Sequence, residues 1–253
     1  MSNISASVRG RLASLARKQG VSFQLVIIRY LQERLIYRLS QSRYRDNFYL
    51  KGGALVYALQ GSKTRFTLDI DLLGKAITGN MQIIKAAFAE ICSLACPSDG
   101  VSFNSETIDA EIISEHNRQN GIRLFIYGGF HTIKQRLQID IGFGDVVVPD
   151  PIQYIEYPVL LSDSEVPVII AYSPETLIAE KFQAMIELSS VNSRMKDFYD
   201  VYKILISRNI DVNSLEESIK ATFLNRQTFY TENHSLFSCV YILLIMVTWN
   251  THA

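Results

Sequence analysis

The chain has 253 residues, of which 48% are hydrophobic, so it can bury the core of one large domain or two small ones. Its 25 Lys and Arg residues balance its 25 Asp and Glu residues, which excludes a globally basic surface and requires any site for a polyanion to be local. Three cysteines without a Cys-x-x-Cys pair are typical of reduced thiols in a cytoplasmic protein.

The N-terminal segment is polar and amphipathic, which predicts a helix over residues 8–18 and no secretory signal. A longer helix is expected over residues 22–43, where leucine and isoleucine recur at helical spacing. We interpret it as an ordinary amphipathic packing helix. Its charged residues occupy the other faces: Arg29, Glu33, Arg34 and Arg38.

Residues 47–75 switch between strand and helix patterns. "NFYLKGG" predicts a short strand that breaks at Gly52 and Gly53, "ALVYALQG" a short helix, and "FTLDIDLL" a second strand. Free backbone N–H groups at the start of such a helix favour a phosphate, and a glycine allows close approach, although a pair of glycines is also common in simple turns.

The strand "FTLDIDLL" carries two carboxylates on one face. Side chains alternate along a strand, so Asp69 and Asp71 point the same way, while Leu68, Ile70 and Leu72 point into the core. Two like charges about 7 Å apart repel each other, and a divalent cation would explain the pair. The alternative is a pair of solvated aspartates on an exposed sheet face.

Further strands and helices are expected along the rest of the chain. The patterns predict a helix over 81–95, strands near 107–113, 122–130, 135–144 and 166–173, and helices over 173–187, 195–207 and 213–225. We therefore expect an α+β fold: a mixed β-sheet with flanking helices in residues 1–172, followed by a small helical domain in residues 173–253.

A third acid follows the same logic. In "QRLQIDIGFG" the apolar residues alternate with Gln138 and Asp140, which share the opposite face. If this strand lies beside the strand of Asp69 and Asp71, three carboxylates converge and could hold two Mg²⁺ ions for in-line phosphoryl transfer.

These motifs resemble the DNA polymerase beta-type nucleotidyltransferase superfamily in the order "GG", "DID" and "IDI". The longer stretches "FYLKGGALVYAL", "RFTLDIDLL", "SPETLIAEKFQAM" and "KDFYDVY" closely resemble the AbiEii/AbiGii family, nucleotidyltransferase-like toxins of bacterial toxin–antitoxin and abortive-infection systems. The resemblance covers roughly residues 47–205 and implies a nucleotidyltransferase-type fold.

The resemblance also implies roles for individual residues. Asp69, Asp71 and Asp140 would bind metal. The family's second motif is lysine-x-aspartate, and here Gln138 replaces the lysine, so one phosphate or substrate contact differs. The positions matching the nucleotide-binding residues are Gly52, Gly53, Arg65, Thr67 and Lys181.

The last two motifs match Ser173 with Lys181, eight residues later, and the pair Asp197 and Asp200. Ser173 would cap a helix whose Lys181 holds a triphosphate, and one of the two aspartates would take a proton from the attacking hydroxyl. The alternatives are structural. Lys181 would then be a surface lysine paired with Glu180 or Glu187, and the aspartates would cap the helix or pair with Arg194 or Lys196.

The sequence thus predicts a cytoplasmic, Mg²⁺-dependent nucleotidyltransferase that moves a nucleoside monophosphate from an NTP to an acceptor. The resemblance makes tRNA the first choice of acceptor and a cognate antitoxin the expected partner. Two alternatives are a small-molecule nucleotidyltransferase of the drug-modifying type and a non-enzymatic interaction protein that retains the fold.

The apolar run at residues 236–249 is shorter than the ~20 residues of a membrane-spanning helix. We expect a buried or partner-covered segment and no membrane contact, with a tail anchor as the alternative. Its composition also suggests that the reading frame or the natural terminus is altered after about Ser238.

Overall fold

The computed structural model describes residues 2–61, 64–115, 119–188, 195–229, 231 and 234. The chain divides into two compact units, of which the first comprises Met1–Gly144 and Ile152–Ala171 and the second comprises Asp145–Pro151 and Tyr172–Ala253. The apolar run at 236–249 and the change suggested after Ser238 lie outside the described residues. In the part that is described, no helix combines the length and the apolar composition that a membrane crossing needs.

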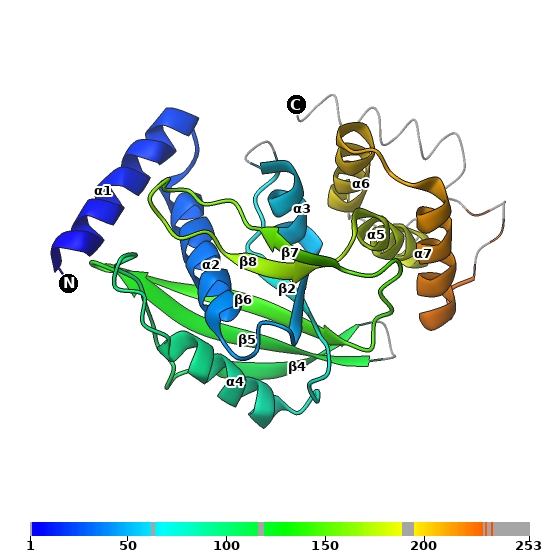
Figure 1. The fold of residues 1–253 in the computed structure, drawn as a ribbon, viewed down its shortest axis with the longest axis horizontal. Helices are drawn as coiled ribbons and strands as arrows, with labels where there is room; N and C mark the ends of the chain where they lie inside the picture. Colours follow the sequence, from blue (N-terminus) through cyan, green and yellow to red (C-terminus); the bar gives the residue numbers. More distant parts are fainter. Residues whose placement is uncertain are drawn as a thin grey trace. The chain divides into compact units, whose positions relative to one another are not determined.

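The first unit is built on a mixed sheet in the order β3-β5-β6-β2-β1-β8-β7, with β4 also paired to β5 (Figure 1). β2 runs parallel to β6 and antiparallel to β1, which confirms the expected mixed sheet and α+β fold. The strands are β1 (Phe48–Lys51), β2 (Asp69–Gly74), β3 (Ser102–Phe103), β4 (Asp109–Glu115), β5 (Gln119–Phe130), β6 (Ile133–Phe143), β7 (Ile152–Glu156) and β8 (Val168–Ala171).

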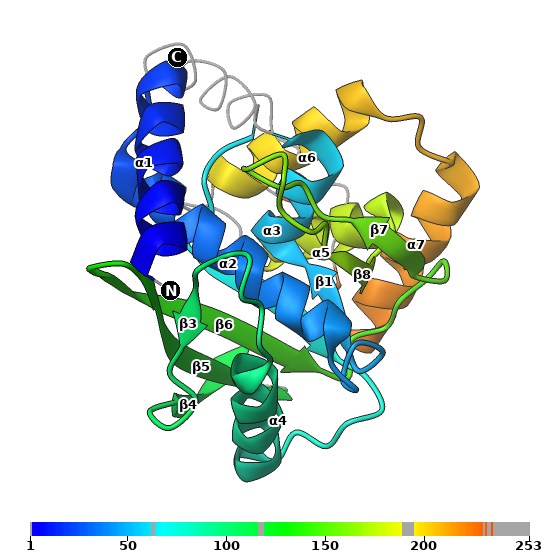
Figure 2. The same cartoon turned by 60° about the vertical axis from the view of Figure 1, so that its left-hand side comes forward.

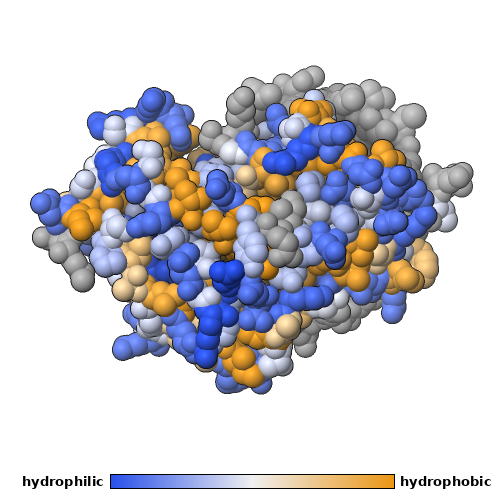
Figure 3. Space-filling model, in the orientation of Figure 1, coloured by the Kyte–Doolittle hydropathy of each residue, from blue (hydrophilic) through white to orange (hydrophobic). Residues whose placement is uncertain are grey.

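Helices cover one face of this sheet. Figure 1 and Figure 2 both show α2 (Phe23–Gln41) and α4 (Met81–Ser93) on the same side of β5 and β6. The side chains that β2 and β6 send toward these helices are buried: Ile70, Leu72, Leu137, Ile139 and Ile141. The unit also contains α1 (Ser2–Gln19) and α3 (Gly52–Gln60), and α3 begins where β1 ends, as the glycine pair predicted. On the face of the molecule in Figure 3, hydrophobic side chains are scattered among hydrophilic ones.

Two expectations about side-chain placement were wrong. Leu68 does not enter the core but is 60% exposed, because β2 begins only at Asp69. The long helix α2 is not an ordinary amphipathic helix, because its charged side chains are buried rather than solvated: Arg29, Glu33, Arg34 and Arg38.

The charged side chains of α2 can be buried because connecting segments supply partners for them. Arg38 forms an ion pair with Asp99 at 2.7 Å and donates a hydrogen bond to the carbonyl oxygen of Val101 at 3.0 Å. Glu33 lies 2.7 Å from Arg34 and accepts a hydrogen bond from the backbone N–H of Leu160 at 2.7 Å. Burial nevertheless outweighs these contacts and raises the pKa of Glu33 to about 7.

Arg29 is held differently, between two aromatic rings. Its guanidinium carbon lies 3.9 Å from the ring centre of Tyr57 on α3 and 4.0 Å from that of Phe66, in the loop before β2. Gln32, one turn further along α2, donates a weak hydrogen bond of 3.4 Å to the carbonyl oxygen of Thr67. α2 therefore fixes the loop that contains Arg65, Phe66 and Thr67.

The second unit contains three described helices, α5 (Pro174–Leu188), α6 (Met195–Ser207) and α7 (Val212–Asn225). Ser173 caps α5 as expected, because its hydroxyl accepts a hydrogen bond from the N–H of Thr176 at 3.1 Å. Thr176 in turn donates to the carbonyl oxygen of Val148 at 2.8 Å, which ties the segment Asp145–Pro151 to this unit. The apolar core of the unit is formed by side chains of α5, α6 and α7: Phe182, Met185, Ile186, Phe198, Val201, Ile219 and Phe223.

Candidate active site

Three carboxylates converge on the sheet face opposite the one that α2 and α4 cover. The parallel register of β2 and β6 sets Asp71 beside Asp140 and Asp69 beside Gln138. Carboxylate oxygens of Asp69, Asp71 and Asp140 all lie within 4.8 Å of one another, and all three residues are partly buried. Clustered carboxylate oxygens are the ligands that Mg²⁺ prefers, so this donor set fits one or two such ions.

The glycine pair brings the N-terminus of α3 against the same carboxylates. Gly52 has a φ of +60°, and a side-chain Cβ at this position would lie 2.0 Å from Oδ2 of Asp71. The backbone N–H of Gly53 donates a hydrogen bond of 3.3 Å to that oxygen. A Cβ at Gly53 would lie 2.7 Å from Oγ1 of Thr67 and 3.5 Å from the guanidinium of Arg65. Only glycine allows this approach. Gly53 and Thr67 therefore contact the acids of β2, and Arg65 lies next to Gly53.

Thr67 also orients one of the acids. Its hydroxyl donates a hydrogen bond of 2.5 Å to Oδ1 of Asp69, two residues further along the chain. The loop before β2 therefore holds the carboxylate of Asp69 and offers polar groups of its own.

Arg123 is a site residue that sequence reasoning missed. It lies directly opposite Asp140 in the antiparallel register of β5 and β6. Its Nε and Nη2 each donate a hydrogen bond of 2.8 Å to a different oxygen of Asp140. These hydrogen bonds raise the pKa of Arg123 above its already high ordinary value. The sequence does contain an indication that Arg123 has a special role, because it is the one charged residue in the otherwise apolar stretch "GIRLFIYGGF".

Gln138, at the position where the family motif has a lysine, contacts the same carboxylate. Its amide nitrogen lies 3.2 Å from both oxygens of Asp140. Arg123 therefore brings to Asp140 the positive charge that a lysine at position 138 would have supplied to this face.

Lys181, Asp197 and Asp200 form a separate cluster within the second unit. The Nζ of Lys181 lies 3.0 Å from Oδ1 of Asp197 and 2.8 Å from Oδ2 of Asp200. All three side chains are buried, so the structural alternative of a surface lysine paired with Glu180 or Glu187 does not hold. The i, i+3 spacing on α6 directs both aspartates toward the lysine of α5.

A mixed sheet that presents three converging carboxylates beside a helix opened by two glycines is the architecture of a nucleotidyltransferase-type domain. Residues 34–244 match the family model described as "Nucleotidyl transferase AbiEii toxin, Type IV TA system". The chain belongs to this family.

Solved structures with a similar chain course have low sequence identity. JHP933 from Helicobacter pylori is 16% identical, with 91% of this chain and 95% of that chain covered and a TM-score of 0.46. An antigenic nucleotidyltransferase-like protein from Paracoccidioides brasiliensis is 14% identical, with 78% and 89% covered and a TM-score of 0.40. The antibiotic-resistance factor ANT(2'')-Ia is 13% identical, with 90% and 95% covered and a TM-score of 0.38. No curated protein matches the chain.

Proposed function

We propose that this protein is a Mg²⁺-dependent enzyme that transfers a nucleoside monophosphate from an NTP to tRNA. The observation that carries the proposal is the convergence of Asp69, Asp71 and Asp140 within 4.8 Å, in a chain that belongs to a nucleotidyltransferase family. In the reaction, an acceptor hydroxyl oxygen bonds to the α-phosphorus, the bond from that phosphorus to the bridging oxygen breaks, and pyrophosphate leaves.

In the first unit, one group of residues would bind the metal and another would bind the triphosphate. Asp69, Asp71 and Asp140 would hold Mg²⁺, which supplies positive charge to the phosphate oxygens when bound. The N–H groups at the start of α3, at Gly52 and Gly53, would donate to the triphosphate, for which the N–H of Gly53 must exchange Oδ2 of Asp71 for a phosphate oxygen. Arg65 and Thr67 lie next to these glycines and would complete the binding of the phosphate chain.

We further propose that the cluster of the second unit serves the acceptor and the triphosphate. Asp197 or Asp200 would take the proton of the acceptor hydroxyl. Lys181 would contact the triphosphate, and to do so its buried Nζ must exchange at least one of its two aspartate partners for a phosphate oxygen. The ion pairs therefore hold the lysine until the nucleotide arrives.

Transfer of a radiolabel from NTP tests this proposal. The acceptors offered are total tRNA, total protein and aminoglycosides, with Mg²⁺ or with EDTA. We expect Mg²⁺-dependent labelling of tRNA, and a loss of at least about a hundredfold in Asp69→Asn, Asp71→Asn and Asp140→Asn. Asp109→Asn is the matched control, because Asp109 is an exposed carboxylate on β4 of the same sheet and keeps its side-chain contact local.

Each outcome of this assay has a definite meaning. Labelling of an aminoglycoside instead of tRNA would assign a small-molecule acceptor. Unchanged labelling in all three aspartate variants would show that the carboxylates are only a solvated face. The toxin–antitoxin family also leads us to propose a cognate antitoxin as partner and the cytoplasm as the location of the reaction.

A further inference from the structure

The face of β5 and β6 that carries Asp140 continues as a row of aromatic and basic side chains. Side chains two residues apart on a strand share a face, so Arg136 and Lys134 follow Asp140 along β6. Phe125 and Tyr127 follow Arg123 along β5 on the same face. The intervening residues Leu124, Ile126, Leu137 and Ile139 are buried on the opposite face. We use the term hairpin track for Phe125, Tyr127, Lys134 and Arg136.

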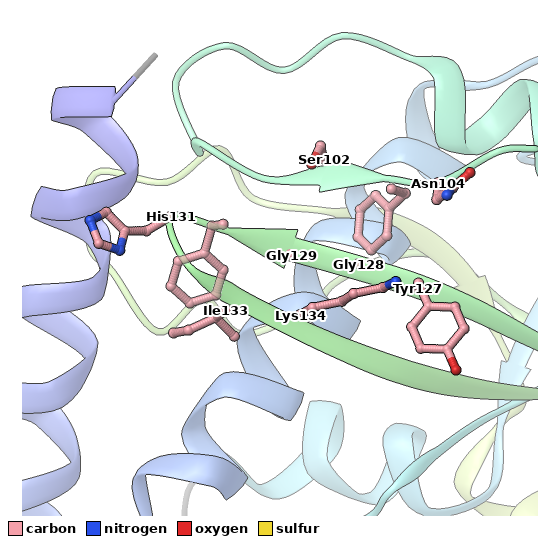
Figure 4. A pocket seen from close by; sticks show the side chains of 10 residues that line it. Ser102, Asn104, Tyr127, Gly128, Gly129, His131, Ile133 and Lys134 are labelled. Carbon is pink, nitrogen blue, oxygen red and sulfur yellow. The ribbon is translucent and has the colours of Figure 1, made fainter. Parts of the chain in front are cut away.

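The cations of the hairpin track lie on its aromatic rings. The guanidinium carbon of Arg136 is 3.6 Å from the ring centre of Phe125, and Nζ of Lys134 is 4.6 Å from that of Tyr127. Figure 4 shows the Lys134 side chain running along the hairpin toward the ring of Tyr127. Lys134 and Arg136 are exposed, and within the described part of the chain neither forms an ion pair with a carboxylate.

The hairpin track begins at the carboxylate triad and leads away from it. Lys134 lies six residues before Asp140 on β6, which corresponds to about 20 Å of extended strand. The edge strand β4 lines the other side of β5 with acids, because Asp109 lies opposite Phe125 and Glu111 opposite Arg123. These acids repel a polyanion at the outer margin, so its path is restricted to the side of β6.

A cavity adjoins the end of the hairpin track near the turn between β5 and β6. This cavity of about 300 Å³ has Asn104, Tyr127, His131 and Lys134 among its lining residues, and the His131 ring points away from the other three (Figure 4). The Oδ1 atom of Asn104 accepts hydrogen bonds from the backbone N–H groups of Glu106 and Thr107, so its amide nitrogen is the group that can donate to the edge of a nucleobase.

We propose that the hairpin track binds the single-stranded end of the nucleic-acid acceptor, which rests on the function proposed above. Arg136 stacked on Phe125 offers a flat surface for a base, and Lys134 and Arg136 offer charge to successive phosphates. Alternation of rings and cations in one row suits a strand whose bases and phosphates alternate at similar intervals. An acidic polypeptide would use the cations but would leave the flat surfaces without a partner.

The test compares two double variants with the same change in charge. Lys134→Gln with Arg136→Gln removes the cations of the hairpin track. Arg43→Gln with Arg45→Gln is the matched control, because these exposed arginines also lie on rings of the first unit, 4.9 Å from that of Tyr44 and 5.0 Å from that of Tyr154. Fluorescence anisotropy measures binding of labelled tRNA without NTP, and calorimetry measures binding of NTP with Mg²⁺.

We expect the hairpin-track variant to bind tRNA at least about fivefold more weakly than the parent and the control to stay within about twofold, with NTP binding unchanged in both. Tyr127→Ser, which keeps the charge, should also weaken tRNA binding at least about fivefold. Pairing the 3′ end of the tRNA with a complementary oligonucleotide should remove the difference between parent and variant.

Three results would overturn the assignment. They are absence of tRNA binding by the parent, equal losses in the hairpin-track and control variants, and unchanged binding in both the double variant and Tyr127→Ser. Displacement of the tRNA by polyglutamate at equal charge concentration would assign the surface to an acidic protein instead. If the parent binds tRNA through the hairpin track but binds no NTP, the inference stands and the proposed function fails.

Discussion

Gly52→Ala directly perturbs the contact between α3 and the carboxylates. At a φ of +60°, an alanine costs about 1–2 kcal/mol in backbone strain. Its Cβ would also lie 2.0 Å from Oδ2, 2.5 Å from Cγ and 2.7 Å from Cβ of Asp71. Rotation of the carboxylate cannot relieve the last of these contacts, because the Cβ of Asp71 is fixed to β2. The start of α3 must therefore move away from the strand, which adds about 1–3 kcal/mol.

Together these costs lower the free energy of unfolding by roughly 2–5 kcal/mol, or the melting temperature by roughly 4–20 °C. Because the start of α3 moves away from β2 and the carboxylate of Asp71 loses its hydrogen bond from Gly53, we also expect Mg²⁺-dependent NTP binding to weaken by about 10–100-fold. Thermal unfolding and calorimetry measure the two effects. Gly20→Ala is the control, because Gly20 has a φ of +66° but open space around its Cβ position, so it shows backbone strain alone. Equal melting temperatures and equal NTP affinities for the two variants would refute the reasoning.

Three further outcomes are expected. Because the pKa of Glu33 in the folded state is raised to about 7 from 4.5, its contribution to stability is complete below about pH 4.5 and is lost as the pH rises through 7. The free energy of unfolding of the parent should therefore fall between pH 4.5 and 7, by at most about 3 kcal/mol from this group, and Glu33→Gln should remove that fall. Urea unfolding at several pH values measures it, and the same pH dependence in parent and variant would contradict the reasoning. Arg123→Gln should lower the melting temperature in EDTA, because three acids then repel each other, and should tighten Mg²⁺ binding about tenfold, because Asp140 loses a competing partner. Weaker Mg²⁺ binding in calorimetry would instead make Arg123 a residue that orients Asp140. Lys181→Met should destabilise the second unit by about 3–5 kcal/mol, because two buried carboxylates lose their counter-ion, and a further Asp200→Asn change should restore part of that loss in thermal unfolding.

The sheet face that each acid occupies could be predicted because it depends on short-range regularities, whereas the convergence of the three acids also needs the pairing of β2 with β6, which was only a condition in the sequence analysis. Alternation along a strand places Asp69 and Asp71 on one face, and the same alternation places Asp140 opposite the apolar residues of its own strand. The glycine pair likewise marks a local change from strand to helix. Such features need only a few neighbouring residues, and the structure contains all of them.

The errors arose where distant segments determine the environment. The charged residues of α2 look solvated in the sequence, because their partners Asp99 and Leu160 lie far along the chain. The pairing of Arg123 with Asp140 depends on the register of β5 and β6, which a single strand does not reveal. The start of β2 at Asp69 decided the exposure of Leu68, and strand ends are set by pairing rather than by alternation.

The polar contacts of α2 have a consequence for how the first unit opens. Surface segments usually exchange their amide hydrogens with solvent long before the core does. Here the amide of Leu160 is bonded to buried Glu33, and the carbonyl oxygen of Val101 to buried Arg38. Breaking either bond while α2 stays docked would leave a buried charged side chain with one hydrogen-bond partner fewer, which costs free energy because no water replaces that partner. Hydrogen exchange at Leu160 should therefore be as slow as in the central strands, so that these segments and the helix open as one cooperative unit.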